Sequence, residues 1–232
     1  MSRLIGIFDG TGAVHRPPYW RLWREAYAAL TYHPPSPDCA GVPPGQGRVV
    51  LVIPAFLTTD VVTRQLRLFL QHCGYRSFGW GLGVNWGPTP RLQLKLRERL
   101  ANLRDLAKDR VSLVGVSLGG LLARDLAYDH PTDVRQVITI ASPINLPTAS
   151  TIEPLIRLAA CFYRPAIDVD RLTSPLPVPS ASIFTRDDGL VAWESCTRAE
   201  ESRANIEVRG PHLTLCRNPD VLRAVAAKLA SL

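Results

Sequence analysis

The sequence predicts one α/β domain, in which a mostly parallel central sheet has helices on both faces. Short apolar runs alternate with helical patterns from residue 49 onward, and such alternation indicates right-handed β-α-β crossovers. The first run, VVLVI at 49–53, is apolar throughout, which is typical of a strand covered on both faces. A chain of 232 residues, 46% hydrophobic and 20% charged, can bury one full core but is short for two domains.

The expected strands and helices follow one another in strict order. Strands are expected at 49–53, 75–82, 111–115, 134–141, 181–185 and 205–208, and helices at 62–73, 90–108, 121–130 and 219–232. In the second helix, Leu96, Leu100 and Leu103 lie on one stripe, as in an amphipathic helix. Pro131 ends the third helix, and Pro219 suits the first turn of the last.

The N-terminal part of the chain stands apart from this pattern. Residues 33–47 are dense in proline and glycine, so they can form neither a helix nor a central strand. Before them, apolar residues recur at helical spacing in 19–30, and we expect an outlying helix that packs on the domain. These apolar residues are Trp20, Trp23, Tyr27 and Leu30. We therefore expect an N-terminal segment, 1–47, that packs on an α/β domain, 48–232.

The alternation of strands and helices breaks between about 143 and 180. This interval contains one helical stretch, at about 151–163, followed by a proline-rich passage. An insertion at this point of the chain lies over the carboxyl edge of a parallel sheet, where ligands bind in such folds. We therefore expect a small cap over the binding edge.

Cysteine content and charge exclude several classes of protein. The five cysteines show no CxxC spacing and no Cys/His clustering, so we expect neither a disulfide framework nor a metal site. The net charge of +7 is spread without a basic run or interleaved aromatics, so we expect no nucleic-acid binding. Because no apolar run is long enough for a membrane span and no secretory signal is evident, we expect no stable membrane insertion and a cytoplasmic location.

A serine lies between two glycines where a predicted strand meets a predicted helix. The stretch Gly115-Val116-Ser117-Leu118-Gly119 has the spacing G-x-S-x-G, which in this context forms a tight, strained turn. Glycines two residues to either side avoid a collision of side chains. The turn exposes the serine hydroxyl at the sheet edge, so Ser117 is the predicted nucleophile rather than part of a purely structural turn.

A serine nucleophile needs a general base, and the base needs an orienting acid. In this architecture both follow the serine, the acid first and the histidine last. Two histidines follow Ser117: His130 ends a helix in a solvated DHP stretch, whereas His212 lies on the loop before the last helix. His212 is therefore the predicted base. Asp187 and Asp188 both follow the strand ASIFT; Asp188, next to a glycine, better suits a turn that aims its carboxylate inward, and Asp187 remains the alternative.

The same edge should supply an oxyanion hole and a substrate pocket. Two backbone N–H donors are needed for the oxyanion, and we expect them from Leu118, directly after the nucleophile, and from Phe56, in the loop after the first strand. The glycine-rich stretch GWGLGVNWGPTP also follows a strand at this edge. Trp80, Asn85 and Trp86 are therefore candidates for lining the pocket, with a structural glycine-rich turn as the alternative.

Four motifs in this order resemble those of α/β-hydrolases, and in particular bacterial lipase- and esterase-like members. They are VLVIPAFLTTD, VGVSLGGLLARDLA, DGLVAW and PHL, and the resemblance spans roughly residues 48–231. It implies ester or thioester hydrolysis through an acyl-enzyme, with neither a metal nor a cofactor. Two departures lie in the oxyanion loop, where Pro54 replaces the common histidine and Ala55 the usual glycine.

These observations predict a serine hydrolase that acts on small-molecule carboxylic esters. The insertion contributes several apolar residues, which favour an apolar acyl group in the substrate. They are Ile152, Leu155, Ile156, Leu158 and Phe162. Two alternatives remain open: an acyltransferase that uses the same triad, and a non-catalytic binding module that has kept the scaffold.

Overall fold

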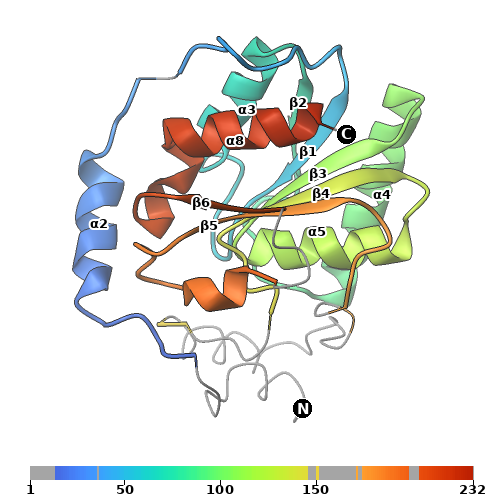
Figure 1. Cartoon of the computed structure of the whole chain (residues 1–232). Coiled ribbons are helices and arrows are strands. Elements are labelled where there is room, and N and C mark those ends of the chain that lie inside the picture. Colours follow the sequence, from blue (N-terminus) through green and yellow to red (C-terminus); the bar gives the residue numbers. More distant parts are fainter. Residues whose placement is uncertain are drawn as a thin grey trace.

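The computed structural model describes residues 14–35, 37–145, 150–151, 171, 174–198 and 204–231. Within these residues a central sheet lies between two layers of helices (Figure 1). Its six strands have the order β2-β1-β3-β4-β5-β6, and every neighbouring pair is parallel. The strands are β1 (Val49–Ile53), β2 (Arg76–Gly79), β3 (Val111–Val116), β4 (Val134–Ile140), β5 (Ser180–Thr185) and β6 (Asn205–Val208). The helices are α2 (Arg21–Thr31), α3 (Arg64–His72), α4 (Pro90–Ala107), α5 (Leu118–Asp129), α8 (Pro219–Ala230) and the short 3-10 helices η1 (Trp193–Cys196) and η3 (His212–Arg217).

The sheet divides the core into two halves. Helices α3 and α8 cover one face of the sheet, and α4 and α5 cover the other (Figure 1). Successive side chains of a strand enter opposite halves, so Val50 and Val52 pack with α3 and α8, while Leu51 and Ile53 pack with α4 and α5. All five residues of β1 are buried for this reason. The predicted fold class is confirmed, and the sheet is parallel throughout.

The proline and cap residues set the starts of two helices. Pro90 and Pro219 occupy the first turns of α4 and α8, where a missing N–H leaves no helical bond unmade. The Thr89 hydroxyl accepts a hydrogen bond from Leu92 N, and the Asn218 amide oxygen accepts one from Asp220 N. These caps satisfy N–H groups that have no partner within the helix.

Strand β2 is shorter than the sequence predicts. It ends at Gly79, whereas the expected strand continues to residue 82. The cause is the Asp60 carboxylate, which accepts hydrogen bonds from Trp80 N at 3.0 Å and Gly81 N at 2.9 Å. Those two N–H groups are therefore unavailable to the sheet, and the chain turns away after Gly79.

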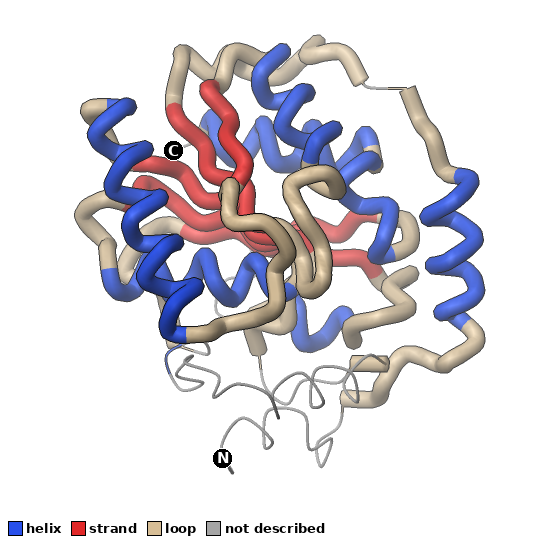
Figure 2. The backbone as a smooth tube through the Cα atoms, turned by 180° about the vertical axis from the view of Figure 1, so that it is seen from behind, coloured by secondary structure: helices blue, strands red, loops and turns tan. Residues whose placement is uncertain are grey.

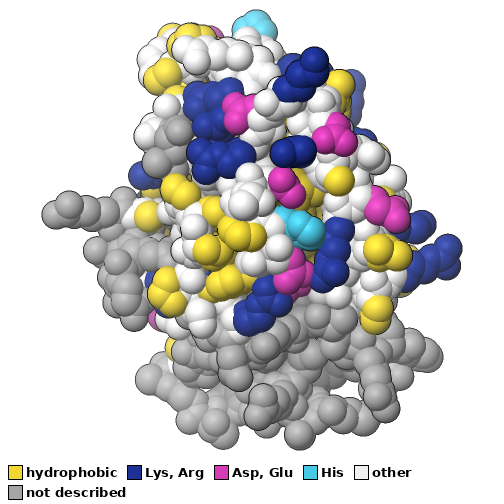
Figure 3. Space-filling model, turned by 90° about the vertical axis from the view of Figure 1, so that its right-hand side faces the viewer, with side chains coloured by type: hydrophobic (Ala, Val, Ile, Leu, Met, Phe, Trp, Pro, Cys, Tyr) yellow, Lys and Arg dark blue, Asp and Glu magenta, His cyan; other side chains and the backbone are white. Residues whose placement is uncertain are grey.

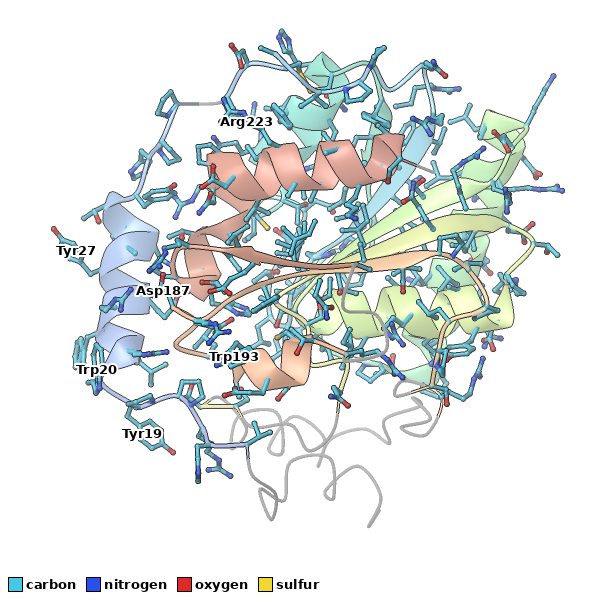
Figure 4. The ribbon with its side chains drawn as sticks, in the orientation of Figure 1. Tyr19, Trp20, Tyr27, Asp187, Trp193 and Arg223 are labelled. Atoms are coloured by element: carbon cyan, nitrogen blue, oxygen red, sulfur yellow. A yellow bond between two sulfur atoms is a disulfide. The ribbon has the colours of Figure 1, made fainter. Side chains whose placement is uncertain are left out.

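The outlying helix exists as α2, but the side expected to pack is the exposed side. Helix α2 stands apart from the two helical layers, at the side of the molecule (Figures 1 and 2). Trp23 and Tyr27 are 81% and 71% exposed, and the labelled side chains of Tyr19, Trp20 and Tyr27 point away from the body (Figure 4). The buried residue of the helix is Glu25, which is 1% exposed. The helical spacing correctly identified the apolar face of the helix, but the opposite face is the one that packs on the domain.

Cysteines form a disulfide that the sequence analysis did not expect. Cys39 and Cys73 are joined across a sequence separation of 34 residues, so the expectation of unpaired cysteines is wrong for this pair. The bond ties the chain after α2 to the end of α3, where Gly45 N also donates a hydrogen bond to Cys73 O. No local spacing announces this pairing because it depends on the path of residues 33–47 over α3.

Most of the predicted cap, including residues 152–163 of the helix expected at about 151–163, lies outside the described residues. Its described residues Ser150 and Thr151 lie against the loop after β5: the Ser150 hydroxyl donates a hydrogen bond to Leu190 O and the Thr151 hydroxyl donates one to Gly189 O.

In the described ranges, no helix is both long enough and apolar enough to cross a bilayer.

Basic and acidic side chains lie next to one another on one side of the molecule (Figure 3). Ion pairs among the described residues join Arg97 with Asp129, Arg104 with Asp133 and Arg135 with Asp109. Part of the positive charge of the described residues is therefore compensated by neighbouring carboxylates.

Candidate active site

Ser117 occupies a strained turn between β3 and α5. Its φ of 51° and ψ of −120° lie in a region that non-glycine residues rarely adopt. The turn is held by close packing: a Cβ at Gly115 would overlap the Gly119 carbonyl, and one at Gly119 would lie 2.6 Å from Pro54 O. Ser117 N also donates a hydrogen bond to Ile140 O at 2.8 Å. The geometry is that of a nucleophile elbow, with glycines where the sequence requires them.

Asp188 and His212 form a buried pair at the carboxyl ends of β5 and β6. His212 Nδ1 lies 2.6 Å from Asp188 Oδ2, and the two side chains are 5% and 2% exposed. The other carboxylate oxygen, Oδ1, accepts hydrogen bonds from Leu190 N and Val191 N, both at 2.8 Å. The aspartate therefore holds the imidazole with its proton on Nδ1, leaving Nε2 available as a base.

Asp187, the alternative acid, is used differently. Its Oδ2 accepts a hydrogen bond from Gly210 N at 3.1 Å, and its Oδ1 lies 4.0 Å from the Arg24 guanidinium. Figure 4 places Asp187 beside α2. The structure thus pairs Asp188, and not Asp187, with His212.

Two opposing effects act on the charge of His212. Burial lowers the pKa of the imidazole, but the carboxylates of Asp188 and Glu25 together outweigh burial and hold the pKa above its ordinary value of 6.5. The neutral form of the ring therefore becomes dominant at a higher pH than it does for an ordinary histidine.

The predicted oxyanion donors lie in adjoining segments. Gly119 packs against the carbonyls of Ile53 and Pro54, which brings the elbow against the loop that contains Phe56. Within the described part of the chain, the N–H groups of Phe56 and Leu118 have no hydrogen-bond acceptor. Both are thus available to a ligand, although their assignment to an oxyanion hole stays a prediction.

Asn85 maintains the loop that contains Phe56. Its side-chain Nδ2 donates to Pro54 O at 2.8 Å, its carbonyl accepts from Leu57 N at 2.7 Å, and its own N–H donates to Thr58 O at 2.9 Å. Leu57 has a φ of 57°, so the loop needs this external support. Asn85 is fully buried, and its amide is already used within the fold.

The other two pocket candidates differ in exposure. Trp80 is 0% exposed and belongs to the core half formed with α4 and α5, with its indole N–H donating to Gly83 O. Trp86 is 61% exposed. Trp80 and Asn85 are thus buried while Trp86 is exposed, and the role of the three residues in a pocket remains a prediction.

The described residues also bear on two other kinds of chemistry, that of a cysteine nucleophile and that of a metal site. The free thiols described, Cys196 and Cys216, are both buried, and burial raises the pKa of Cys216 to about 12, which disfavours the nucleophilic thiolate. Across the described ranges, no group of three or more His, Cys, Asp or Glu side chains is arranged to hold a metal ion.

Sequence reasoning missed Glu25, which joins α2 to both loops of the Asp188–His212 pair. Its carboxylate accepts hydrogen bonds from the backbone N–H groups of Gly189, His212 and Leu213. The available signal was a carboxylate on the side of the helix opposite the aromatic residues. A single glutamate at that position is ordinarily a solvated residue, so the contact could be recognised only in three dimensions.

Comparison with known proteins supports the fold. No family model matches the chain, and no curated protein matches it in sequence. Among solved structures, that described for the metagenome-derived lipolytic enzymes LipS and LipT has a TM-score of 0.60 and 14% identity, over 82% of this chain and 96% of that one. The metagenomic carboxyl esterase MGS0156 has a TM-score of 0.58 and 15% identity, over 87% and 80%. An extracellular α/β-hydrolase from a Paenibacillus species has a TM-score of 0.52 and 14% identity, over 77% and 97%. The chain therefore has the α/β-hydrolase fold, and identities this low establish nothing finer.

Proposed function

We propose that this α/β-hydrolase-fold protein is a serine hydrolase that cleaves carboxylic esters through an acyl-enzyme on Ser117. The observation that carries the proposal is the buried Asp188–His212 pair, at the same edge of the sheet as the strained Ser117 turn. An aspartate that fixes a histidine tautomer, at the sheet edge where a serine lies on a strained strand-to-helix turn, is part of the arrangement that acyl transfer requires.

Each group has a defined role in the proposed reaction. His212 Nε2 accepts the Ser117 proton as the hydroxyl oxygen attacks the ester carbonyl, and Asp188 stabilises the resulting imidazolium. The N–H groups of Phe56 and Leu118 stabilise the oxyanion of the tetrahedral intermediate. His212 then gives its proton to the leaving alcohol, and in the second half-reaction it activates water to release the acid.

The substrate we propose is a small-molecule ester with an apolar acyl group. Two of the structures similar in fold are described as lipolytic enzymes and as a carboxyl esterase, which supports an ester as the substrate. The apolar residues of the insertion point in the same direction.

A fluorophosphonate probe tests the nucleophile directly. The folded wild-type protein should be labelled, and Ser117→Ala should lose labelling together with hydrolysis of p-nitrophenyl esters. Ser180→Ala is the matched control, because Ser180 begins β5 at the amino edge of the sheet and should leave labelling unchanged. Wild-type protein that is folded but unlabelled would favour a binding module instead. Product analysis with an added alcohol or amine distinguishes hydrolysis from acyl transfer.

We also infer that the protein works in an oxidising compartment rather than in the cytosol. The support is the Cys39–Cys73 disulfide, and one protein similar in fold is described as extracellular. Alkylation of the denatured protein without reductant, followed by mass spectrometry, should leave Cys39 and Cys73 unmodified when the protein is taken from its native host. Modification of both residues would exclude this location.

A further inference from the structure

We propose that Glu25 is a positioning residue that fixes the acid loop and the histidine loop relative to each other. This inference rests on the proposed function, because it assigns Glu25 a task in presenting Asp188 and His212. Glu25 is not expected to touch the substrate; it acts through the backbone of the two loops.

The Glu25 carboxylate bridges segments far apart in the sequence. Oε1 accepts hydrogen bonds from Gly189 N and His212 N, both at 2.8 Å, and Oε2 accepts one from Leu213 N at 2.9 Å. Gly189 follows the acid directly, and His212 is the base itself. One carboxylate thus fixes the main chain on both sides of the Asp188–His212 hydrogen bond.

Close packing shows that helix α2 fits tightly onto the acid loop. A Cβ at Gly189 would lie 2.8 Å from Glu25 Cγ and 3.0 Å from Arg21 Cβ. Arg21 Nη1 also donates to Arg186 O at 2.9 Å and to Asp188 O at 3.1 Å. Glycine is therefore required at 189 because α2 occupies the space that a side chain would fill.

The histidine loop has its own attachment to the same helix. Arg217, at the end of η3, donates a hydrogen bond from Nη2 to Ala29 O at 2.9 Å. Helix α2 therefore holds both loops, and Glu25 accepts hydrogen bonds from both.

A carboxylate suits this position better than a neutral residue of the same shape. It can accept all three N–H groups, whereas the amide nitrogen of a glutamine would oppose Leu213 N donor to donor. Within the described residues no Lys or Arg forms an ion pair with Glu25, so its negative charge acts on the neighbouring imidazole. That charge favours the imidazolium, which forms when His212 accepts the serine proton.

The test compares Glu25→Gln with the wild-type protein by NMR titration of the histidine ring. His212 is assigned by the signal that disappears in His212→Asn. Within the described residues, the other charge that acts on the His212 ring is that of Asp188, and it is unchanged in Glu25→Gln. In Glu25→Gln we expect the pKa of His212 to fall. We also expect the downfield NMR signal of its Nδ1 proton to lose intensity. Glu207→Gln is the matched control, since it removes an exposed carboxylate on β6 that pairs with Arg186, and it should move neither signal.

Kinetics provide the second measurement. In Glu25→Gln we expect kcat to fall roughly 10- to 100-fold with little change in KM, because the catalytic pair is displaced rather than the substrate site. The acidic limb of the kcat/KM profile should move to lower pH together with the His212 pKa. A wild-type titration and wild-type kcat in folded Glu25→Gln would overturn the inference.

The two proposals can fail separately. If the wild-type protein is not labelled by the fluorophosphonate, the proposed hydrolase function is wrong, while the NMR titration still decides whether Glu25 positions the pair. If the wild type is labelled but Glu25→Gln loses only thermal stability, with an unmoved pH profile, the function stands and Glu25 is merely structural.

Discussion

At the scale of single residues, strain at Ser117 is maintained by its neighbours. A residue with φ of 51° and ψ of −120° stores on the order of 1–3 kcal/mol, and such a conformation persists only where the surroundings leave no alternative. Here the hydrogen bond to Ile140 O and the packing of Gly115 and Gly119 leave no room for relaxation. These contacts hold Ser117 in its strained conformation at the sheet edge.

The two adjacent aspartates should respond very differently to substitution. Asp188→Asn removes the negative charge that holds the Nδ1 proton of His212, so we expect kcat to fall roughly 10³- to 10⁴-fold. Asp187→Asn, the control, changes a carboxylate whose hydrogen-bond partner is Gly210 N, and we expect less than a several-fold change. Steady-state hydrolysis of a p-nitrophenyl ester measures both, and equal losses in the two variants would contradict the assignment.

The pKa of His212 sets the pH range of activity. The base must be neutral to accept a proton, and its pKa is raised above 6.5, so activity should be lost as pH falls through that raised value. The pH dependence of kcat/KM reports ionisations of the free enzyme, so we expect its acidic limb to have an apparent pKa above 6.5. A pH-rate profile between about pH 5 and 9 measures it. A midpoint below the ordinary histidine value would show that burial outweighs the two carboxylates.

At the scale of elements, the disulfide anchors the N-terminal segment that carries α2. It closes a loop with a sequence separation of 34, and its removal should lower the free energy of unfolding by about 2–4 kcal/mol. The double variant Cys39→Ser/Cys73→Ser, unfolded in urea, measures this loss. As a control, dithiothreitol should lower the midpoint of the wild type and leave that of the variant unchanged. Equal midpoints for the wild type with and without reductant would contradict the prediction.

The contrast between α5 and α2 shows what sequence periodicity can and cannot predict. Helix α5 was predictable because its apolar run and its end near Pro131 are local features, although it begins at Leu118 rather than at the predicted residue 121. Helix α2 was predictable as a helix, but not in its orientation. The side that faces the body is the one with Glu25, because its carboxylate accepts hydrogen bonds from the N–H groups of Gly189, His212 and Leu213. These groups belong to loops more than 160 residues away in the sequence. The sequence pattern around a glutamate is the same whether its side chain is solvated or buried, so it could not show which side of α2 faces the body.

At the scale of the whole molecule, the parallel sheet explains how the order of motifs could predict a site. Because every strand pair is parallel, residues that directly follow β3, β5 and β6 meet at one edge regardless of their separation in the chain. This topology made Ser117, Asp188 and His212 candidates together. The choice between Asp187 and Asp188, and the Cys39–Cys73 pairing, depend on side-chain direction and chain path, which the order of elements does not contain.

The position of each strand in the sheet also determines its stability. Strands β3 and β4 each pair with a neighbour on both sides, whereas β2 and β6 lie at the edges. Strand β3 is buried along its whole length, whereas β2 has one exposed and two half-buried residues. Opening an edge strand exposes less apolar surface than opening the centre, so hydrogen exchange should reach the edges first.

Hydrogen exchange followed by mass spectrometry should therefore reveal three classes of amide in the intact protein. Those of β3 and β4 should exchange slowest, through global unfolding, and those of β2 much faster. The N–H groups of Gly189, His212 and Leu213 should lie between these classes, because they are buried but depend on the attachment of α2. In Glu25→Gln only this middle class should become faster, while β3 stays unchanged at equal global stability. If all three classes were to accelerate together, α2 would belong to the same cooperative unit as the sheet, and Glu25 would stabilise the whole fold rather than the two loops alone.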